Sequence, residues 1–269
     1  PPLLMKKIIS GLGLVIMGCE DPIAVKLPAA ENKLVIDAML WRNLNEPSGT
    51  LEVMLSRTTD YYDEQVPLVS NATVSLQTPN AVLTAQENAP GHYHVYGVDI
   101  NETDSFTLSL RVDDATYSAT ASLVLSTPLD RVVQGENTLI SGDQVEAIVT
   151  LTDRPEEGNY YLMDFGYNNL FVTRDAFYNG NQISFSFFYD KYFPKNTPTP
   201  VYLMGVDKDF YTYMQILISH AGQDGGGPFA TAKSTLRGNI QNTTNSNDFP
   251  LGYFRVVERD SVIFTAVEE

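Results

Sequence analysis

The sequence predicts a mainly β protein, with an N-terminal immunoglobulin-like antiparallel β-sandwich over residues 33–126 and a second β-rich domain with one α-helix over residues 127–269. Two observations lead to this prediction. Short runs that alternate apolar and polar residues recur along the chain, and this alternation is the period of a strand with one buried face. One segment, residues 207–221, instead repeats its apolar residues at helical spacing.

Strand-like runs fill the first region, with polar turns between them and no helical period. The alternation is clearest in Ala72–Leu76 and Phe106–Val112, where apolar and polar residues would lie on opposite faces. Several short strands at such intervals are typical of an immunoglobulin-like sandwich. The predicted strands are Leu34–Leu40, Leu51–Leu55, Ala72–Leu76, Val82–Ala85, His92–Tyr96, Phe106–Val112 and Tyr117–Val124.

The segment Ser126-Thr127-Pro128 marks the predicted boundary with the second region. The helix there has Asp207 as a candidate N-cap, because its carboxylate can accept from free amides of the first turn, and Gly222 as a suitable stop. The strands predicted around it are Val145–Leu151, Tyr160–Tyr167, Ile183–Tyr189, Val201–Val206, Tyr253–Val257 and Val262–Ala266.

The start of the chain has the pattern of a lipoprotein signal peptide, and residues 1–18 are assigned to it together with four residues expected to lie upstream of Met5. Lys6 and Lys7 form a positive region, and the apolar run Ile8–Met17 follows. That run is about half of the roughly 20 residues that a membrane-spanning helix needs. A cleaved signal is therefore favoured over a membrane span.

The next residues predict a lipid anchor and a tether over residues 19–32. Ile16-Met17-Gly18-Cys19 resembles the lipobox of bacterial lipoproteins, in which the cysteine thiol receives diacylglycerol and becomes the first residue. Cys19 is the only cysteine of the chain, so it has no disulfide partner within it. Glu20 and Asp21 resemble the lipoprotein export signal of Bacteroidota, which leads to the outer face of the outer membrane. The alternative is an ordinary signal peptide with an incidental cysteine.

The charge of the chain excludes one class of partner. The formal net charge is −16, with 17 Lys and Arg against 33 Asp and Glu. Nucleic acid is excluded because its phosphates require a basic surface. Peripheral binding to anionic lipid is disfavoured for the same reason, and solubility alone is a sufficient role for the acidic surface.

The motifs of common enzymes are absent from the sequence, and we predict a non-enzyme without cofactor or metal. His92 and His94 would face the same side of a strand and could seat a metal, although two ordinary strand residues are the simpler interpretation. The acidic stretch 99–104 could ligate calcium but lacks the EF-hand spacing, and a solvated hairpin turn is favoured there. A surface hydrolase stays open as a minor alternative.

One loop is a candidate for partner binding. Arg57, Tyr61 and Tyr62 lie between two predicted strands among acidic residues. Exposed tyrosine is favoured at recognition surfaces because it offers a large contact area at low entropic cost. The alternative is that both tyrosines fold back over the end of the sandwich.

Several short stretches together resemble a Bacteroidota lipoprotein family described as a domain of unknown function, whose members are commonly encoded beside TonB-dependent receptors. The order of these stretches along the chain carries the resemblance. They are Cys19-Glu20-Asp21-Pro22, Leu27-Pro28, Lys33-Leu34-Val35-Ile36-Asp37, Leu55-Ser56-Arg57-Thr58 with Tyr61 or Tyr62, Val69-Ser70-Asn71-Ala72-Thr73-Val74, Gly91-His92-Tyr93 and Gly252-Tyr253-Phe254-Arg255-Val256.

The resemblance implies a lipid-anchored outer-membrane protein that faces the cell surface and assists a transporter. We therefore expect a non-catalytic accessory or binding subunit whose partner is a TonB-dependent receptor, its ligand, or both. The alternative is a cell-surface adhesin or glycan-binding module built on the same sandwich.

Overall fold

The computed structural model describes residues 32–59, 65–139, 142–221 and 235–268. Cys19, Glu20, Asp21, Tyr61 and Tyr62 lie outside these ranges. The described elements are β1 (Leu34–Asn43), β2 (Ser48–Arg57), β3 (Thr73–Gln77), β4 (Val82–Thr84), β5 (Gln86–Ala89), β6 (His92–Asp99), β7 (Ser105–Val112), β8 (Ala115–Val124), β9 (Leu129–Gln134), β10 (Val145–Thr152), β11 (Tyr160–Asp164), β12 (Leu170–Arg174), the 3₁₀ turn η1 (Asp175–Phe177), β13 (Gln182–Tyr189), β14 (Thr199–Val206), α1 (Lys208–His220), β15 (Gln241–Asn242) and β16 (Leu251–Phe264).

The strands β1 to β8, together with the last strand β16, form a two-layer β-sandwich. One layer has the order β16-β1-β2-β6-β5, and the other has the order β4-β3-β7-β8. In β1 the residues Ile36, Ala38 and Leu40 are fully buried between the layers, while the alternate residues are less buried. This is the period-two burial that the sequence predicts. The seven strands expected before residue 127 are all present, and the sandwich is consistent with the predicted immunoglobulin-like type.

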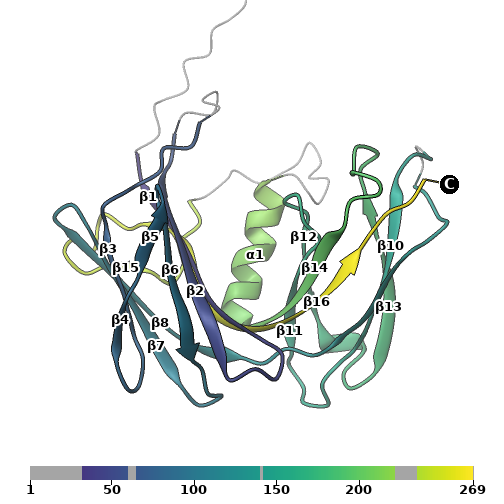
Figure 1. The fold of residues 1–269 in the computed structure, drawn as a ribbon, viewed down its shortest axis with the longest axis horizontal. Coiled ribbons are helices and arrows are strands. Elements are labelled where there is room, and N and C mark those ends of the chain that lie inside the picture. Colours follow the sequence, from purple (N-terminus) through teal and green to yellow (C-terminus); the bar gives the residue numbers. More distant parts are fainter. Residues whose placement is uncertain (1–31, 60–64, 140–141, 222–234, 269) are drawn as a thin grey trace, which may run out of the picture.

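The last strand, β16, joins the two halves of the molecule. Its first part pairs in parallel with β1, from Val35↔Leu251 to Asn43↔Arg259. Its second part pairs antiparallel with β14, from Met204↔Arg259 to Thr199↔Phe264. One curved sheet therefore continues from the first sandwich into the second half, with β16 along its floor (Figure 1).

The expectation of two separate strands, Tyr253–Val257 and Val262–Ala266, is wrong. The four polar residues between them, residues 258–261, look like a turn in the sequence but lie within one 14-residue strand. Pairing with two different neighbours satisfies the backbone there. Glu258 is tolerated at 4% exposure because a basic side chain from β1 reaches it.

The second half has its own core, between the three-stranded sheet β13-β10-β9 and the strands β11, β14 and the end of β16. Tyr189 is its aromatic centre, stacked on Phe193 and Phe264 with ring centroids 3.8 and 5.7 Å away. The structure adds β5, β9, β12 and β15 to the strands expected from the sequence. The division of the chain at residue 127 stays a prediction, since β16 contributes Phe254 to the first core and Phe264 to the second.

The helix α1 stands in the hollow of the curved sheet (Figure 1). Its predicted N-cap is confirmed, because Asp207 Oδ1 accepts from the amide of Phe210 at 2.7 Å. Phe210 and Met214 are buried against the sheet, and the ring of Tyr253 lies 4.9 Å from that of Phe210. The predicted mainly β fold is thus confirmed, and α1 is the one α-helix among the described residues. In the part of the chain that the structure describes, no helix is long and apolar enough to cross a membrane.

Candidate functional site

The face of the curved sheet that carries α1 is the candidate functional surface. Because side chains alternate along a strand, β1 turns Ile36 and Leu40 into the sandwich core and Val35, Met39 and Trp41 to the opposite face. The same alternation in β2, β14 and β16 brings their outward side chains onto this face. We call it the helix face of the sheet.

A groove of about 830 Å³ lies on the helix face, between α1 and the strands β1, β2, β11, β14 and β16. Most of its lining is apolar or aromatic. Met39 and Met54 come from β1 and β2, Met204 comes from β14, and Tyr213 comes from α1. A hollow of this size with a few converging polar groups is the usual form of a small-molecule site. The polar groups are therefore the informative part.

The first polar group is an ion pair on the floor of the groove. Arg255 Nη1 lies 2.6 Å from Asp37 Oδ1, and the exposed fractions of the two side chains are 16% and 51%. The guanidinium of Arg255 also lies 5.2 Å from the centroid of the Phe210 ring. Arg255 is thereby neutralised and held between the sheet and the helix.

The second polar group is Arg259, which lies between two aromatic rings. Its guanidinium carbon is 3.3 Å from the centroid of the Trp41 ring and 4.7 Å from that of Tyr202. Burial lowers the pKa of Arg259, and the nearby Tyr202 and Glu52 oppose that shift. Within the described residues, no carboxylate lies at ion-pair distance from this guanidinium. Its charge is met by aromatic faces instead.

Several buried nitrogen atoms on the helix face have no hydrogen-bond partner among the described residues. They are Trp41 Nε1, His94 Nδ1, Arg255 Nε and Arg259 Nε. Three of these are N–H donors, and buried donors are normally paired. Of these residues Arg255 and Arg259 line the groove, which therefore presents two arginines to a molecule that carries acceptor oxygens.

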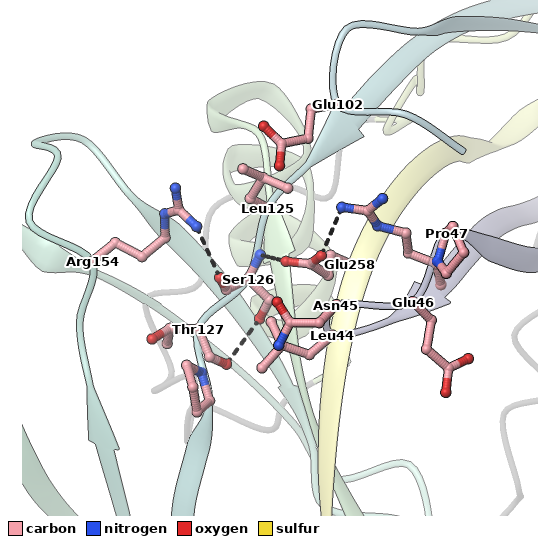
Figure 2. Close-up of a pocket in the computed structure, with 12 residues that line it drawn as sticks. Leu44, Asn45, Glu46, Pro47, Glu102, Leu125, Ser126, Thr127, Arg154 and Glu258 are labelled. Atoms are coloured by element: carbon pink, nitrogen blue, oxygen red, sulfur yellow. Dashed lines mark hydrogen bonds and ion pairs between the residues drawn. The ribbon is translucent and has the colours of Figure 1, made fainter. Parts of the chain in front are cut away.

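A second hollow, of about 510 Å³, lies on the other side of β16. It holds the buried ion pair between Arg42 Nη2 and Glu258 Oε1, 2.9 Å apart. Glu258 Oε2 accepts from the amide of Ser126 at 3.1 Å, and Arg154 donates to the Ser126 carbonyl at 3.4 Å, as Figure 2 shows. These charges join β1, β16 and the β8–β9 connection to one another. We assign this hollow a structural role.

Among the residues singled out from the sequence, Arg57 is described and lies apart from the groove lining. Its Nη2 atom is 3.3 Å from Asp113 Oδ2, in the turn that follows β7. Tyr61 and Tyr62 lie outside the described residues, as do Cys19, Glu20 and Asp21. The partner-binding role of the loop and the lipidation of Cys19 stay predictions.

The two strand histidines lie on one face of β6, as the spacing predicts. In the strand register His92 is opposite Met54 and His94 is opposite Glu52. The ring of His94 stacks on Tyr96, with centroids 5.7 Å apart. Among the described side chains, no three His, Cys, Asp or Glu residues gather as metal ligands. The acidic stretch 99–104 includes the turn between β6 and β7, where Asp104 accepts from Asn101.

The sequence analysis did not single out Trp41, Tyr202 or Arg259. Trp41 is the only tryptophan of the chain, and it has the same parity as Val35 and Met39 in a strand whose other face is apolar. That signal could have identified the helix face. Nothing local could have predicted that Arg259 would reach Trp41, because β1 and β16 are more than 200 residues apart.

Fold and groove together define a mainly β protein whose curved sheet presents an aromatic, arginine-bearing hollow beside the helix α1. The chain belongs to the family described as a domain of unknown function, DUF4249, whose model matches residues 20–262. No curated protein matches the chain.

Proposed function

We propose that this protein is a non-catalytic binding lipoprotein of the outer membrane, and that it serves as an accessory subunit of a TonB-dependent receptor. In this proposal the lipid on Cys19 anchors the chain to the membrane and the acidic pair Glu20-Asp21 directs it to the cell surface. The groove on the helix face then holds a ligand that the receptor takes up.

The observation that carries the proposal is the groove itself. It combines apolar and aromatic walls with Arg255 and Arg259, whose Nε donors have no partner among the described residues. Such a lining suits binding, because apolar area supplies affinity and a few directed polar groups supply selectivity. The lipobox around Cys19 supports the membrane location, since acyl chains buried at about 0.8 kcal/mol per CH₂ give stable anchoring when more than one is present.

The anchor and the partner are tested separately, in the organism that encodes the protein. Labelled palmitate should enter the full chain and fail to enter the Cys19→Ser variant. Cross-linking in intact outer membranes, followed by purification of the protein, should recover a TonB-dependent receptor. The absence of such a receptor from the cross-linked partners would overturn the accessory role, and equal labelling of both chains would overturn the anchor.

A glycan-binding module is the second candidate, and the aromatic character of the helix face favours it. Tyr96 is 68% exposed and lies across β2 from Trp41, with Thr50 between them in the strand register, and exposed aromatic rings can stack on sugars. Binding of the acylated protein to immobilised neutral oligosaccharides, lost in Tyr96→Ala, would select this function. Recovery of a cross-linked TonB-dependent receptor, with no binding to the glycans, would select the accessory role.

A further inference from the structure

We infer that the groove on the helix face binds a small organic ligand with one anionic oxygen group on an apolar body, and that Arg259 holds the anionic group. The inference rests on the proposed function for the view that the groove holds a ligand, and it adds the chemical class of that ligand.

Three arginines near the middle of the curved sheet differ in how their charges are met. Arg42 is paired with Glu258 at 2.9 Å, and Arg255 is paired with Asp37 at 2.6 Å. Arg259 has no such partner among the described residues, although burial already lowers its pKa. A partly buried cation is normally paired, because removing it from water is unfavourable. Arg259 is therefore the position on the helix face where an added anion gains most.

The aromatic rings around Arg259 contact the faces of its guanidinium, so the edge of this planar group can bind the anion. Trp41 covers one face of the guanidinium, and Tyr202 adds a second ring 4.7 Å away. The N–H bonds of a guanidinium lie in its plane, so both stacked rings leave the in-plane donors to a ligand. Arg259 lines the groove, and its Nε donor has no partner among the described residues. A carboxylate matches this fork with two parallel hydrogen bonds.

The backbone holds Arg259 in place before a ligand arrives. The residue lies where β16 changes neighbours, opposite Asn43 of β1 and Met204 of β14. Its carbonyl accepts from the amide of Leu44 at 2.8 Å. With its backbone held by strands on both sides and its guanidinium against the Trp41 ring, Arg259 loses little freedom on binding, and this preorganisation favours affinity.

The other groups in the groove set the charge and shape of the ligand. Glu52 lies close enough to influence the pKa of Arg259 but outside ion-pair distance, so it would repel a second negative charge. Met39, Met54 and Met204 line the remaining space with flexible thioethers that adapt to an apolar body. These features specify a monoanion with an apolar remainder.

The test uses the acylated protein in phosphatidylcholine nanodiscs, with empty nanodiscs as the blank. Calorimetry would compare 2-naphthoate with the uncharged 2-naphthamide, which has the same shape. We expect saturable binding of naphthoate at one site, about tenfold tighter than naphthamide, since a charge-assisted pair contributes about 1.4 kcal/mol or more. Equal affinities for the two compounds would overturn the inference without the need for any variant.

Three variants and one control locate the site. Arg259→Gln should weaken naphthoate about tenfold and remove its advantage over naphthamide, while Arg259→Lys should give an intermediate loss because it keeps the charge and loses the fork. Arg131→Gln is the matched control, since Arg131 is exposed on β9 and does not line the groove. Glu52→Gln should tighten naphthoate roughly twofold to threefold. An unchanged affinity in Arg259→Gln would overturn the assignment.

The outcomes separate this inference from the proposed function. A cross-linked TonB-dependent receptor without preference for naphthoate would end the inference and leave the accessory role standing. Naphthoate binding that depends on Arg259, without a receptor partner, would support the ligand class and end the accessory role. Binding of neutral sugars in the groove that Arg259→Gln does not weaken would overturn the anionic ligand.

Discussion

Arg42 and Glu258 are 216 positions apart in the sequence, and their side chains meet at 2.9 Å in the interior. Arg42 also donates to the Ile100 carbonyl at 2.8 Å, and Glu258 accepts from the Ser126 amide at 3.1 Å. The pair thus binds the first and last described strands to two connections of the sandwich. The next residue, Arg259, points to the opposite face of β16. Glu258 therefore forms an ion pair in the interior, while Arg259 lines the groove.

Glu258→Gln should destabilise the protein by about 3 kcal/mol, because it leaves the buried Arg42 without a counter-charge. Urea unfolding measures the loss. Arg57→Gln is the matched control, since its partner Asp113 is 82% exposed and such surface pairs contribute less than about 1 kcal/mol. If the two variants lost similar amounts of unfolding free energy, the buried ion pair would stabilise the protein no more than the surface pair does.

Gly252→Ala should destabilise the protein by about 3 kcal/mol and weaken the pairing of β16 with β1. Gly252 has a φ of +97°, and an added Cβ would meet the Ile36 carbonyl of the neighbouring strand. Gly97→Ala is the control, because its φ of +68° is also positive but no atom lies within 4 Å of the added Cβ. Strain alone should cost about 1 kcal/mol there. Thermal unfolding would rank the two, and a larger loss in Gly97→Ala would contradict the close approach of the strands.

Asp207→Ala should destabilise the protein by about 1 kcal/mol, because the amide of Phe210 then loses its acceptor at the start of α1. The control is Asp209→Ala, two residues later in the first turn, which removes an exposed carboxylate that does not cap the helix. Since α1 forms one wall of the groove, amide hydrogen exchange in residues 208–212 should rise in Asp207→Ala alone. Equal exchange in both variants would show that the cap does not hold the helix.

Alkaline pH should destabilise the protein through buried tyrosines. Burial raises the pKa of Tyr178 to about 12, and its hydroxyl is 3.0 Å from Thr173 Oγ1. An unfolded tyrosine ionises near pH 10. The folded state therefore keeps its proton longer than the unfolded state, and stability falls as the pH rises from about 10 towards 12.

This pH dependence can be followed by tyrosinate absorbance together with urea unfolding. Burial also raises the pKa of Tyr161 and Tyr189, so several tyrosines should ionise only when the protein unfolds. Tyr178→Phe should make the decline between about pH 10 and 12 shallower. A stability that stays constant over this range in the parent protein would contradict the burial of these rings.

The sequence predicted the elements whose pattern is local. Alternation in Ala72–Leu76 and Phe106–Val112 identified strands β3 and β7, and Asp207 with the apolar residues after it identified α1. In each case neighbouring residues along the chain decide which side chains are buried.

The sequence did not predict features that depend on distant residues. The polar run 258–261 resembles a turn until Arg42 is known to lie beside Glu258. All four residues of β5 are exposed, so its sequence has no alternation of apolar and polar residues that would predict a strand. The groove escaped prediction for the same reason, since Trp41, Tyr202 and Arg259 meet only when β16 is inserted between β1 and β14.

That insertion has a consequence for the order of events in time. During synthesis the N-terminal part of the chain leaves the ribosome first. The edge of β1 that pairs with β16 is therefore exposed long before residues 251–264 are available. An unpaired strand edge invites pairing with other chains. Contacts of such long sequence separation also form slowly. The sheet is therefore completed only at the end of translation. Molecular chaperones would be needed most while β1 is exposed and β16 has not yet been synthesised.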